Sequence, residues 1–463
     1  MLTVILLLAC QDTAVPKPNA NQKPSFVVID IDSLRLDRMV GPKSPATQIN
    51  NLALNSIFLN SVYAPASWTY PALTGLLTGQ SPPLSDYDGN NVAWIPSSRR
   101  SLPEILRYYG YTTEVFWGDT LPAKQTRFSE IFGKECLDCT DNGFQNPTKW
   151  LTNASTDTPF FLFIHNMDLH HYTPSVPIEA LHHTVDAVEG CRQASIPNVS
   201  HSLESRLPKQ DAQTHVIAHY DGMLRYYDSQ LAELFKAIKN RADADNIVII
   251  VLANHGEALF ESELLGHARI HHDSVLRTGL IWHDKSLSRK GQNKSPLSLT
   301  DVAPSILERA GIPSDHQMTG RSFLPLLRGE EWVDEPVYAS TDLHVASVIE
   351  DQWKLSMQYL PCKDPSQRKA QAPLKPDSCT VLYNRLEDPI ENQDFAIAMP
   401  ELKNRLQDQL VQWLKLQIQR NAEVKTDSAD DQLKAALKER GYWGDAETVK
   451  GETQSPSPTQ PSK

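Results

Sequence analysis

The sequence has no excess of positive charge and no long hydrophobic run. Its 463 residues carry 44 lysines and arginines against 56 aspartates and glutamates, so the formal net charge is −12. A chain of this charge lacks the basic field that attracts nucleic acid, and we expect no nucleic-acid partner. Its first apolar stretch, Met1–Leu8, is much shorter than the roughly 20 residues that a membrane-spanning helix requires. The length is sufficient for a large core together with a smaller second domain.

Cysteines are few, and they show no complete zinc-binding pattern. Outside the first ten residues they are Cys136, Cys139, Cys191, Cys362 and Cys379. Cys136 and Cys139 could form half of a zinc site or a redox pair, but no second Cys or His pair is spaced for zinc nearby. A structural disulfide from this pair to Cys191 is therefore the expectation. In an oxidising compartment we also expect Cys362 to pair with Cys379, which would close a loop rich in proline and lysine.

The N-terminal stretch resembles a bacterial lipoprotein signal. It ends Leu7-Leu8-Ala9-Cys10-Gln11, which makes Cys10 the candidate lipidated residue. No Lys or Arg precedes the apolar run, so the alternative is an N-terminus without a targeting function. With the signal in residues 1–10, residues 11–25 would be a flexible tether to a membrane surface. We expect an exported lipoprotein in the outer membrane, in the periplasm or on the cell surface.

Two strongly apolar runs predict buried strands of a parallel sheet. Phe26–Ile31 is followed by Asp32, and Ile247–Ala253 is followed by Asn254 and His255. Strands that are covered on both faces read as continuous apolar runs, and ligands bind beyond the carboxyl ends of such strands. Helices alternate with the strands along the chain, as in a doubly wound α/β sheet. We therefore expect a carboxylate, an amide and an imidazole to meet at one edge, where they could share a divalent ion.

A threonine stands next to a short apolar helix. Pro71 suits the first turn of a helix and Gly79 suits its end, which predicts a helix over Ala72–Thr78 with Thr69 just before it. Unpaired backbone N–H groups and the positive end of the helix dipole would face the Thr69 hydroxyl. Such surroundings stabilise an alkoxide or a bound oxyanion during attack on a phosphorus or sulfur ester. The alternative is that Thr69 only caps the helix.

These segments resemble, in the same order, motifs of the sulfatase family within the alkaline phosphatase superfamily. Asp32–Asp37 is similar to the first metal-ligand motif, Thr69–Gly79 to the nucleophile motif and Asn254–Leu259 to the Asp-His-Gly-Glu motif. The resemblance extends from about residue 26 to residue 442. It implies an α/β fold, namely an alkaline-phosphatase-like, doubly wound and mostly parallel sheet with a small C-terminal α+β subdomain.

The resemblance also divides the chain. It implies a sulfatase-like α/β domain with the metal and nucleophile site over residues 26–334, and a C-terminal subdomain with a small antiparallel sheet and helices over residues 335–445. Residues 173–214 carry no strong periodic pattern and are expected to form an insertion or lid. The Tyr and Asp positions of a long helix that begins at Tyr220 are expected to pack and to cap. The polar segment 446–463 predicts a disordered tail.

A divalent cation is the cofactor that the resemblance implies. One Ca, Mg, Mn or Zn ion would be held by Asp32, Thr69, Asn254 and His255. Asp30 lies two residues before Asp32 on the same face of its strand, as either a second ligand or a buried structural partner. Asn254 stands where the family carries an aspartate, so the site has one carboxylate fewer and a weaker affinity for a hard cation is expected.

The catalytic roles follow from the same resemblance. Thr69 would be the nucleophile, and His170 and His267 would stabilise the transferred group and the leaving oxygen. Asp168 and His170 would contact the substrate or a second metal. Thr69 carries a methyl group on Cβ and cannot be oxidised to the formylglycine of true sulfatases, so we expect no such cofactor.

Two functions are left open. The first is a metal-dependent hydrolase of sulfate or phosphate esters, or a phosphotransferase, that uses Thr69 on a small-molecule, glycan or lipid ester. The alternative is a catalytically degenerate lipoprotein with the sulfatase fold that acts as a binding module. The enzyme is favoured because a site without turnover would not require all of its polar residues, namely Thr69, Asp32, His255, His170 and His267.

Overall fold

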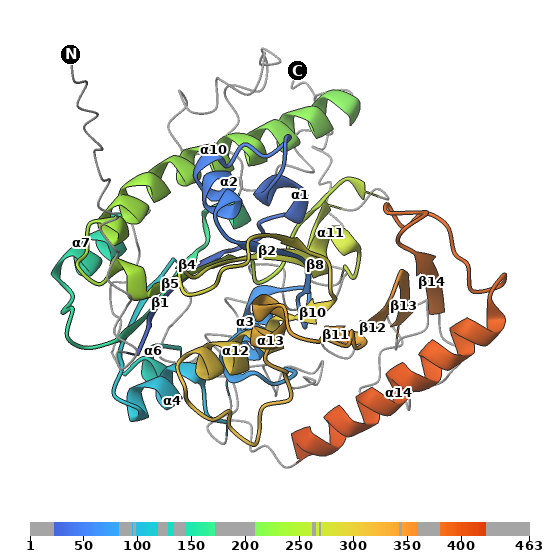
Figure 1. Cartoon of the computed structure of the whole chain (residues 1–463). Helices are drawn as coiled ribbons and strands as arrows, with labels where there is room; N and C mark the ends of the chain where they lie inside the picture. The colour runs from blue at the N-terminus through green and yellow to red at the C-terminus, as the bar shows by residue number, and fades with distance from the viewer. Residues whose placement is uncertain are drawn as a thin grey trace, which may run out of the picture.

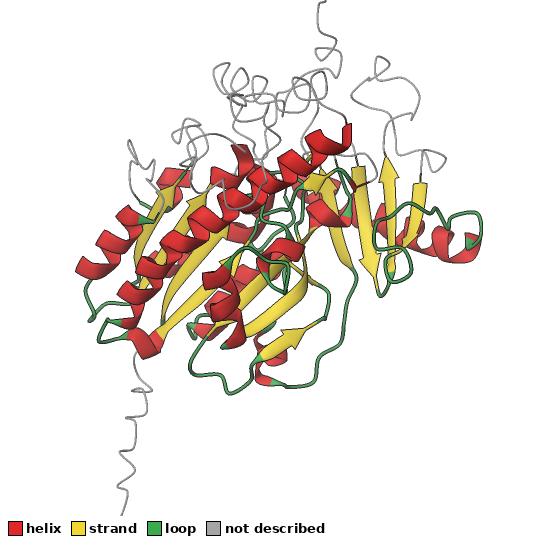
Figure 2. Cartoon of the chain, turned by 90° about the horizontal axis from the view of Figure 1, so that it is seen from above, coloured by secondary structure: helices red, strands yellow, loops and turns green. Residues whose placement is uncertain are grey.

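The computed structural model describes residues 23–82, 95, 99–118, 128–133, 144–171, 209–261, 265–267, 270–341, 345–358 and 380–422. They form a large sheet between two layers of helices, with a smaller sheet beside it (Figure 1). Seen from above, the strands of the large sheet run side by side, and the smaller group of strands stands apart at one end (Figure 2). The predicted α/β fold is confirmed.

The large sheet is mostly parallel. Its strand order is β10-β2-β8-β5-β1-β4-β3, and β9 pairs with β2. β8 runs antiparallel to its two neighbours, whereas the other pairs are parallel. The bounds are β1 Ser25–Ile31, β2 Ile57–Tyr63, β3 Thr112–Trp117, β4 Phe160–Asn166, β5 Ile247–Leu252, β8 Arg277–His283, β9 Gly291–Asn293 and β10 Leu297–Ser298. Every residue of β1, β4 and β5 is buried, which is why these strands read as mostly apolar runs.

Helices cover both faces of this sheet (Figure 1). One layer contains α1 Leu36–Met39, α2 Thr47–Leu54, α7 Gln145–Asn153 and α10 Lys209–Lys239. The other contains α3 Thr69–Thr78, α4 Leu102–Tyr108, α6 Phe128–Ile131, α12 Val302–Arg309 and α13 Leu324–Arg328. The short elements are η1 Asp168–His171, η2 Ala244–Asn246, η4 Leu299–Asp301, α11 Asp273–Leu276 and the hairpin of β6 Ala258–Leu259 with β7 Leu265–Gly266.

The long helix α10 differs from its prediction at one end. It begins at Lys209 rather than at Tyr220. The predicted capping role is borne out by Asp228, whose carboxylate accepts the backbone N–H groups of Gln48 and Ile49 at 2.7 and 2.9 Å. These residues lie in the first turn of α2, which has no side-chain cap of its own. Asp228 therefore satisfies N–H groups that would otherwise be unpaired.

The small sheet is antiparallel, in the order β11-β12-β13-β14. Its strands are β11 Val337–Thr341, β12 Val345–Glu350, β13 Trp353–Gln358 and β14 Thr380–Asn384. The helix α14, Pro400–Ala422, packs against it through Leu406, Leu410 and Leu414, which share one helix face because they are four residues apart. Within the described ranges, no helix has the length and apolar character that crossing a membrane requires.

Several predictions concern residues outside this description. They are the lipidation of Cys10, most of the tether 11–25, the cysteine pairs, most of the segment 173–214 and the tail 446–463. The last residue assigned to the tether, Ser25, is the first residue of β1. The boundaries of the two domains also stay predictions.

Candidate active site

Three neighbouring strands end at the predicted site. β1, β4 and β5 are adjacent and parallel, so their carboxyl ends meet at one edge of the sheet. Asp32 directly follows β1, and Asn254 and His255 follow β5. All three are fully buried, each with 0% relative exposure. The backbone N–H of Asp32 donates to the carbonyl of Asn166 at 2.9 Å, which holds the end of β1 against the end of β4.

Thr69 reaches the same edge of the sheet from a helix, α3, rather than from a strand. It is the first residue of α3, so the helix begins three residues earlier than the sequence predicted. The Thr69 hydroxyl donates to Asp32 Oδ2 at 2.9 Å and lies 3.2 Å from His255 Nε2. Trp68 takes the cap position of α3, without a side-chain cap hydrogen bond. The side chain of Thr69 is thus committed to the sheet edge rather than to capping.

Asp32 accepts three hydrogen bonds from protein groups. Ser33 Oγ donates to Oδ1 at 2.9 Å, while Thr69 Oγ1 and Asn254 Nδ2 both donate to Oδ2 at 2.9 Å. Burial by itself raises the pKa of this carboxyl, but nearby imidazoles hold the pKa below its ordinary value. Those imidazoles belong to His255, His170, His165 and His267. Asp32 is therefore ionised.

The histidines predicted for catalysis lie in the same cluster. His255 Nδ1 is 2.8 Å from the carbonyl of Gly256, so Nδ1 carries a proton, and Nε2 lies 3.2 Å from Thr69 Oγ1. The His267 ring lies 4.5 Å from the His255 ring, and its Nδ1 is 2.9 Å from Glu257 Oε2. The His170 ring is 4.8 Å from the His267 ring. The structure thus brings together Thr69, Asp32, Asn254, His255, His267 and His170.

Asp168 takes part in a local contact. It is the first residue of η1, and its carboxylate accepts the side-chain amide of Asn166 at 2.6 Å. Its own N–H donates to Asn166 Oδ1 at 3.2 Å. Asn166 and Asp168 therefore fix the turn after β4 that carries His170. A substrate role for Asp168 stays a prediction.

A buried hydrogen bond beneath the site joins Asp30, for which the sequence left a structural partner open, to His165, which the sequence did not single out. His165 Nδ1 lies 2.7 Å from Asp30 Oδ2, and both side chains are completely buried. His165 Nε2 points to the other side, 3.8 Å from Asp32 Oδ2. Asp30 is thus a structural partner of His165. The signal was available, because both are polar residues inside apolar runs and they face each other in the register of β1 and β4.

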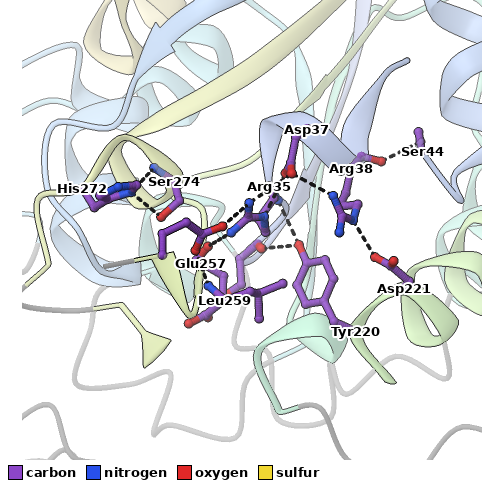
Figure 3. Close-up of polar contacts among 12 residues, drawn as sticks. Arg35, Asp37, Arg38, Ser44, Tyr220, Asp221, Glu257, Leu259, His272 and Ser274 are labelled. Carbon is purple, nitrogen blue, oxygen red and sulfur yellow. Dashed lines mark hydrogen bonds and ion pairs between the residues drawn. The ribbon is translucent and has the colours of Figure 1, made fainter. Parts of the chain in front are cut away.

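The second group that sequence reasoning missed surrounds Arg35 (Figure 3). Its guanidinium contacts Asp37 at 2.8 Å, the Glu257 carbonyl at 2.8 Å and the Glu261 carboxylate at 2.7 Å. Arg35 therefore ties the loop that follows β1 to the loop that follows β5. Tyr220, which was expected only to pack, accepts the backbone N–H of Arg35 at 2.9 Å. No local pattern relates Tyr220 to Arg35, because the two are far apart in the chain.

The residues at the edge do not fit the divalent cation that the sequence predicted. No group of three or more His, Cys, Asp or Glu side chains in the described ranges is arranged to hold a metal ion. Asp32 is the one carboxylate of the predicted ligand set, which otherwise contains Thr69, Asn254 and His255. The amide nitrogen of Asn254, not its oxygen, faces Asp32. Hard divalent cations prefer several oxygen ligands, and the partial positive charge of an amide N–H group does not attract them.

The sheet and the site together define a protein of the alkaline phosphatase superfamily. Residues 24–312 match the model of the family described as Sulfatase. The chain therefore belongs to the sulfatase family, whose members are hydrolases that generally depend on a metal ion.

Known relatives resemble it at low identity. A Delta 4,5-hexuronate-2-O-sulfatase of Bacteroides thetaiotaomicron is 19% identical over 371 residues, which are 70% of this chain and 76% of the relative. The multifunctional alkaline phosphatase superfamily protein PehA of Trinickia caryophylli is 31% identical over 146 residues, which are 30% of this chain and 28% of that protein. Among solved structures, a 2-O GAG sulfatase aligns with a TM-score of 0.65 and 16% identity, over 89% of this chain and 96% of the other. At this identity the structural likeness shows the fold alone.

Proposed function

We propose that this chain hydrolyses sulfate or phosphate esters with Thr69 as the nucleophile. The observation that carries the proposal is the position of the Thr69 hydroxyl, 2.9 Å from Asp32 Oδ2 and 3.2 Å from His255 Nε2. A hydroxyl within hydrogen-bond distance of two basic groups is the usual arrangement of an activated nucleophile. It also lies at the first turn of a ten-residue helix, where backbone N–H groups favour negative charge.

Each residue of the cluster has its own role in the proposed reaction. Thr69 Oγ1 forms a bond to phosphorus or sulfur while the bond to the ester oxygen breaks. For this step the hydroxyl turns from Asp32 Oδ2 toward His255 Nε2, which takes its proton. Burial lowers the pKa of His255 below its ordinary value although Asp32 raises it, so the ring is neutral at neutral pH and can take that proton. His267 lies beside His255, and His170 lies beside His267; these two rings stabilise the transferred group and the leaving oxygen. Water then cleaves the Thr69 ester, or an acceptor alcohol does so in a phosphotransferase.

Metal dependence belongs to the family and was predicted for this chain. The reaction above makes no use of a cation because the side chains do not fit one in this arrangement. Threonine forms stable phosphate esters and cannot form formylglycine, so phosphate esters are the first substrates to test. The hexuronate sulfatase among the relatives supports a saccharide as the alcohol part of the ester.

Threonines of the same helix allow a matched test. The hydroxyls of Thr74 and Thr78 donate to the helix carbonyls of Tyr70 and Thr74, at 2.8 and 2.6 Å. We expect Thr69→Ala to lower hydrolysis of p-nitrophenyl phosphate or sulfate by at least about 100-fold, because covalent catalysis is lost. Thr78→Ala, with the same loss of a hydroxyl from the same helix, is expected to retain activity. Equal activity of wild type and Thr69→Ala would refute the role of Thr69.

The second candidate is a binding module without turnover. It is favoured by the hydrogen bond from the Asn254 amide to Asp32, which replaces a carboxylate of the family motif. Under this alternative no ester is hydrolysed by wild type, and substitution of Thr69 changes ligand affinity alone.

We also propose that the chain is an exported lipoprotein anchored through Cys10, as the sequence predicted. Metabolic labelling with a radioactive fatty acid tests this, because the label should be lost in Cys10→Ala.

A further inference from the structure

The hydrogen bonds of Asp32 leave little room for an additional ligand. A carboxylate offers about four lone-pair positions. Three of them accept protons from Ser33, Thr69 and Asn254, each at 2.9 Å. Both lone pairs of Oδ2 accept protons, from Thr69 and Asn254, whereas Oδ1 accepts one proton and lies 3.5 Å from His255 Nε2. A calcium ion at its usual distance of about 2.3–2.6 Å from Oδ2 would have to displace Thr69 or Asn254.

The orientation of the Asn254 amide is fixed by its own neighbour. The backbone N–H of His255 donates to Asn254 Oδ1 at 2.7 Å. An N–H group requires an acceptor, so the oxygen of the amide must lie on this side and the NH2 group must lie toward Asp32. A reversed amide would place two donors against each other and two oxygens against each other. The buried backbone therefore holds the amide nitrogen at the position from which a family aspartate would present an oxygen.

The same geometry shows what an aspartate would do at residue 254. One carboxylate oxygen could still accept the N–H of His255. The other would stand in the place of the amide nitrogen, about 2.9 Å from Asp32 Oδ2, where two anionic oxygens repel unless a cation lies near both. The difference between the two side chains is a single atom, and that atom changes from a hydrogen-bond donor to a metal ligand.

We infer that the Asn254 amide takes the place of the divalent cation at Asp32, so that the site of this chain is assembled by hydrogen bonds without a metal ion. The inference goes beyond the proposed hydrolysis and does not depend on whether Thr69 is a nucleophile. It concerns the occupancy of the site, and metal content measures this directly.

The experiment compares the full-length wild type with Asn254→Asp. Each protein is dialysed against Ca²⁺, Mg²⁺, Mn²⁺ or Zn²⁺, passed through a desalting column and analysed for bound metal, and its Tm is recorded with and without the ion. We expect no stoichiometric ion in wild type and no change in its Tm. Asn254→Asp should have a lowered Tm without metal, bind about one ion per chain, and regain at least about 2 °C at an ion concentration near 100 times its Kd.

A matched control adds the same charge elsewhere. Asn384 is also buried, and its Oδ1 accepts the N–H groups of Leu386 and Glu387, so an aspartate there keeps these bonds. Asn384→Asp should bind no more metal than wild type. One tightly held ion in wild type would overturn the inference. It would also be overturned if Asn254→Asp bound no more metal than Asn384→Asp, since residue 254 would then not decide occupancy. Turnover is not measured, so a failed hydrolase proposal would leave either result intact.

Discussion

Ser33 has a backbone conformation that side chains other than glycine rarely adopt. Its φ is 59°, in the left-handed region, where a residue with a side chain is strained. Its carbonyl accepts the Tyr220 hydroxyl at 2.7 Å, and its own hydroxyl donates to Asp32 Oδ1 at 2.9 Å. Tyr220 therefore stabilises the turn that presents Asp32 to Thr69.

Removal of this one hydroxyl tests the positioning role. Tyr220→Phe keeps the buried ring but leaves the Ser33 carbonyl and the Arg35 N–H without their partner. We expect the free energy of unfolding to fall by about 1–3 kcal/mol, as for buried polar groups that lose a hydrogen bond. Activity that depends on Thr69 should fall as well, in kcat more than in KM. Tyr108→Phe is the control, because Tyr108 is 86% exposed and should change neither quantity. A Tyr220→Phe variant with unchanged kcat would contradict the positioning role.

At the scale of elements, a chain of hydrogen bonds joins the small sheet to the segment before α3. Ser347 on β12 contacts His271 Nδ1 at 2.8 Å, and His271 Nε2 contacts Thr341 at the end of β11 at 2.9 Å. Thr341 Oγ1 in turn lies 2.7 Å from Ser67 Oγ. Ser67 stands two residues before Thr69, so the small sheet holds the start of the helix that carries Thr69.

His271 makes this connection sensitive to acid. Burial, followed by the charge of Lys354, lowers the pKa of His271 from its ordinary value of 6.5 to about 3. The folded protein thus keeps the ring neutral at pH values where the unfolded chain binds a proton. Stability from this residue is fully present above about pH 6.5 and is lost as the pH falls toward 3.

We predict that the unfolding free energy of wild type depends more steeply on pH than that of His271→Gln. Between pH 7 and pH 5 the unfolding free energy of wild type should fall by about 2 kcal/mol more than that of His271→Gln, which cannot bind the proton. Urea unfolding followed by tryptophan fluorescence at both pH values measures this. Parallel pH profiles of the two proteins would show that His271 binds its proton equally well in the folded state.

The sequence predicted the end of α3 correctly but not its first residues. Its cap position is occupied by Trp68, which makes no side-chain cap hydrogen bond, so the sequence carries no Ser, Thr, Asp or Asn at the cap to mark the first turn. Gly79, with φ 64°, ends the helix as predicted, because a glycine adopts this conformation at little cost. The strands β1 and β5 were predictable because burial on both faces makes most of their residues apolar.

At the scale of the whole molecule, the sequence predicted which residues meet but not how they bind. Parallel strands place Asp32, Asn254 and His255 at one edge by a general rule, and the structure has them there. The direction of the Asn254 amide depends on a single backbone N–H, which only three-dimensional geometry reveals. The contacts of Tyr220 with Ser33 and Arg35 join distant parts of the chain and leave no periodic trace in the sequence.

The junction between the two sheets contains a buried group of charges. Lys354 on β13 is 0% exposed and contacts both Asp273 Oδ1, at 3.2 Å, and Glu391. Arg385 pairs with Asp273 Oδ2 at 3.2 Å. Burial by itself raises the pKa of Asp273, but the charges of Lys354 and Arg385 hold this pKa below its ordinary value. Burial raises the pKa of Glu391 to about 8 although Lys354 opposes this rise, so Glu391 is mostly protonated below that pH.

These two carboxyl groups should respond differently to the same kind of substitution. Asp273→Asn leaves Lys354 and Arg385 buried without their ionised partner, and we expect a loss of about 3–5 kcal/mol in unfolding free energy. Glu391→Gln at pH 6 replaces a group that is already neutral, and its loss should be much smaller. Urea unfolding at pH 6, followed by near-ultraviolet circular dichroism, compares them. Lys354 lies on β13 of the small sheet, whereas Asp273 lies in the segment before β8 of the large sheet. A large loss of unfolding free energy in Asp273→Asn alone would therefore establish that one ionised carboxylate holds the two sheets together. Equal losses would instead mean that both carboxylates are charged in the folded protein.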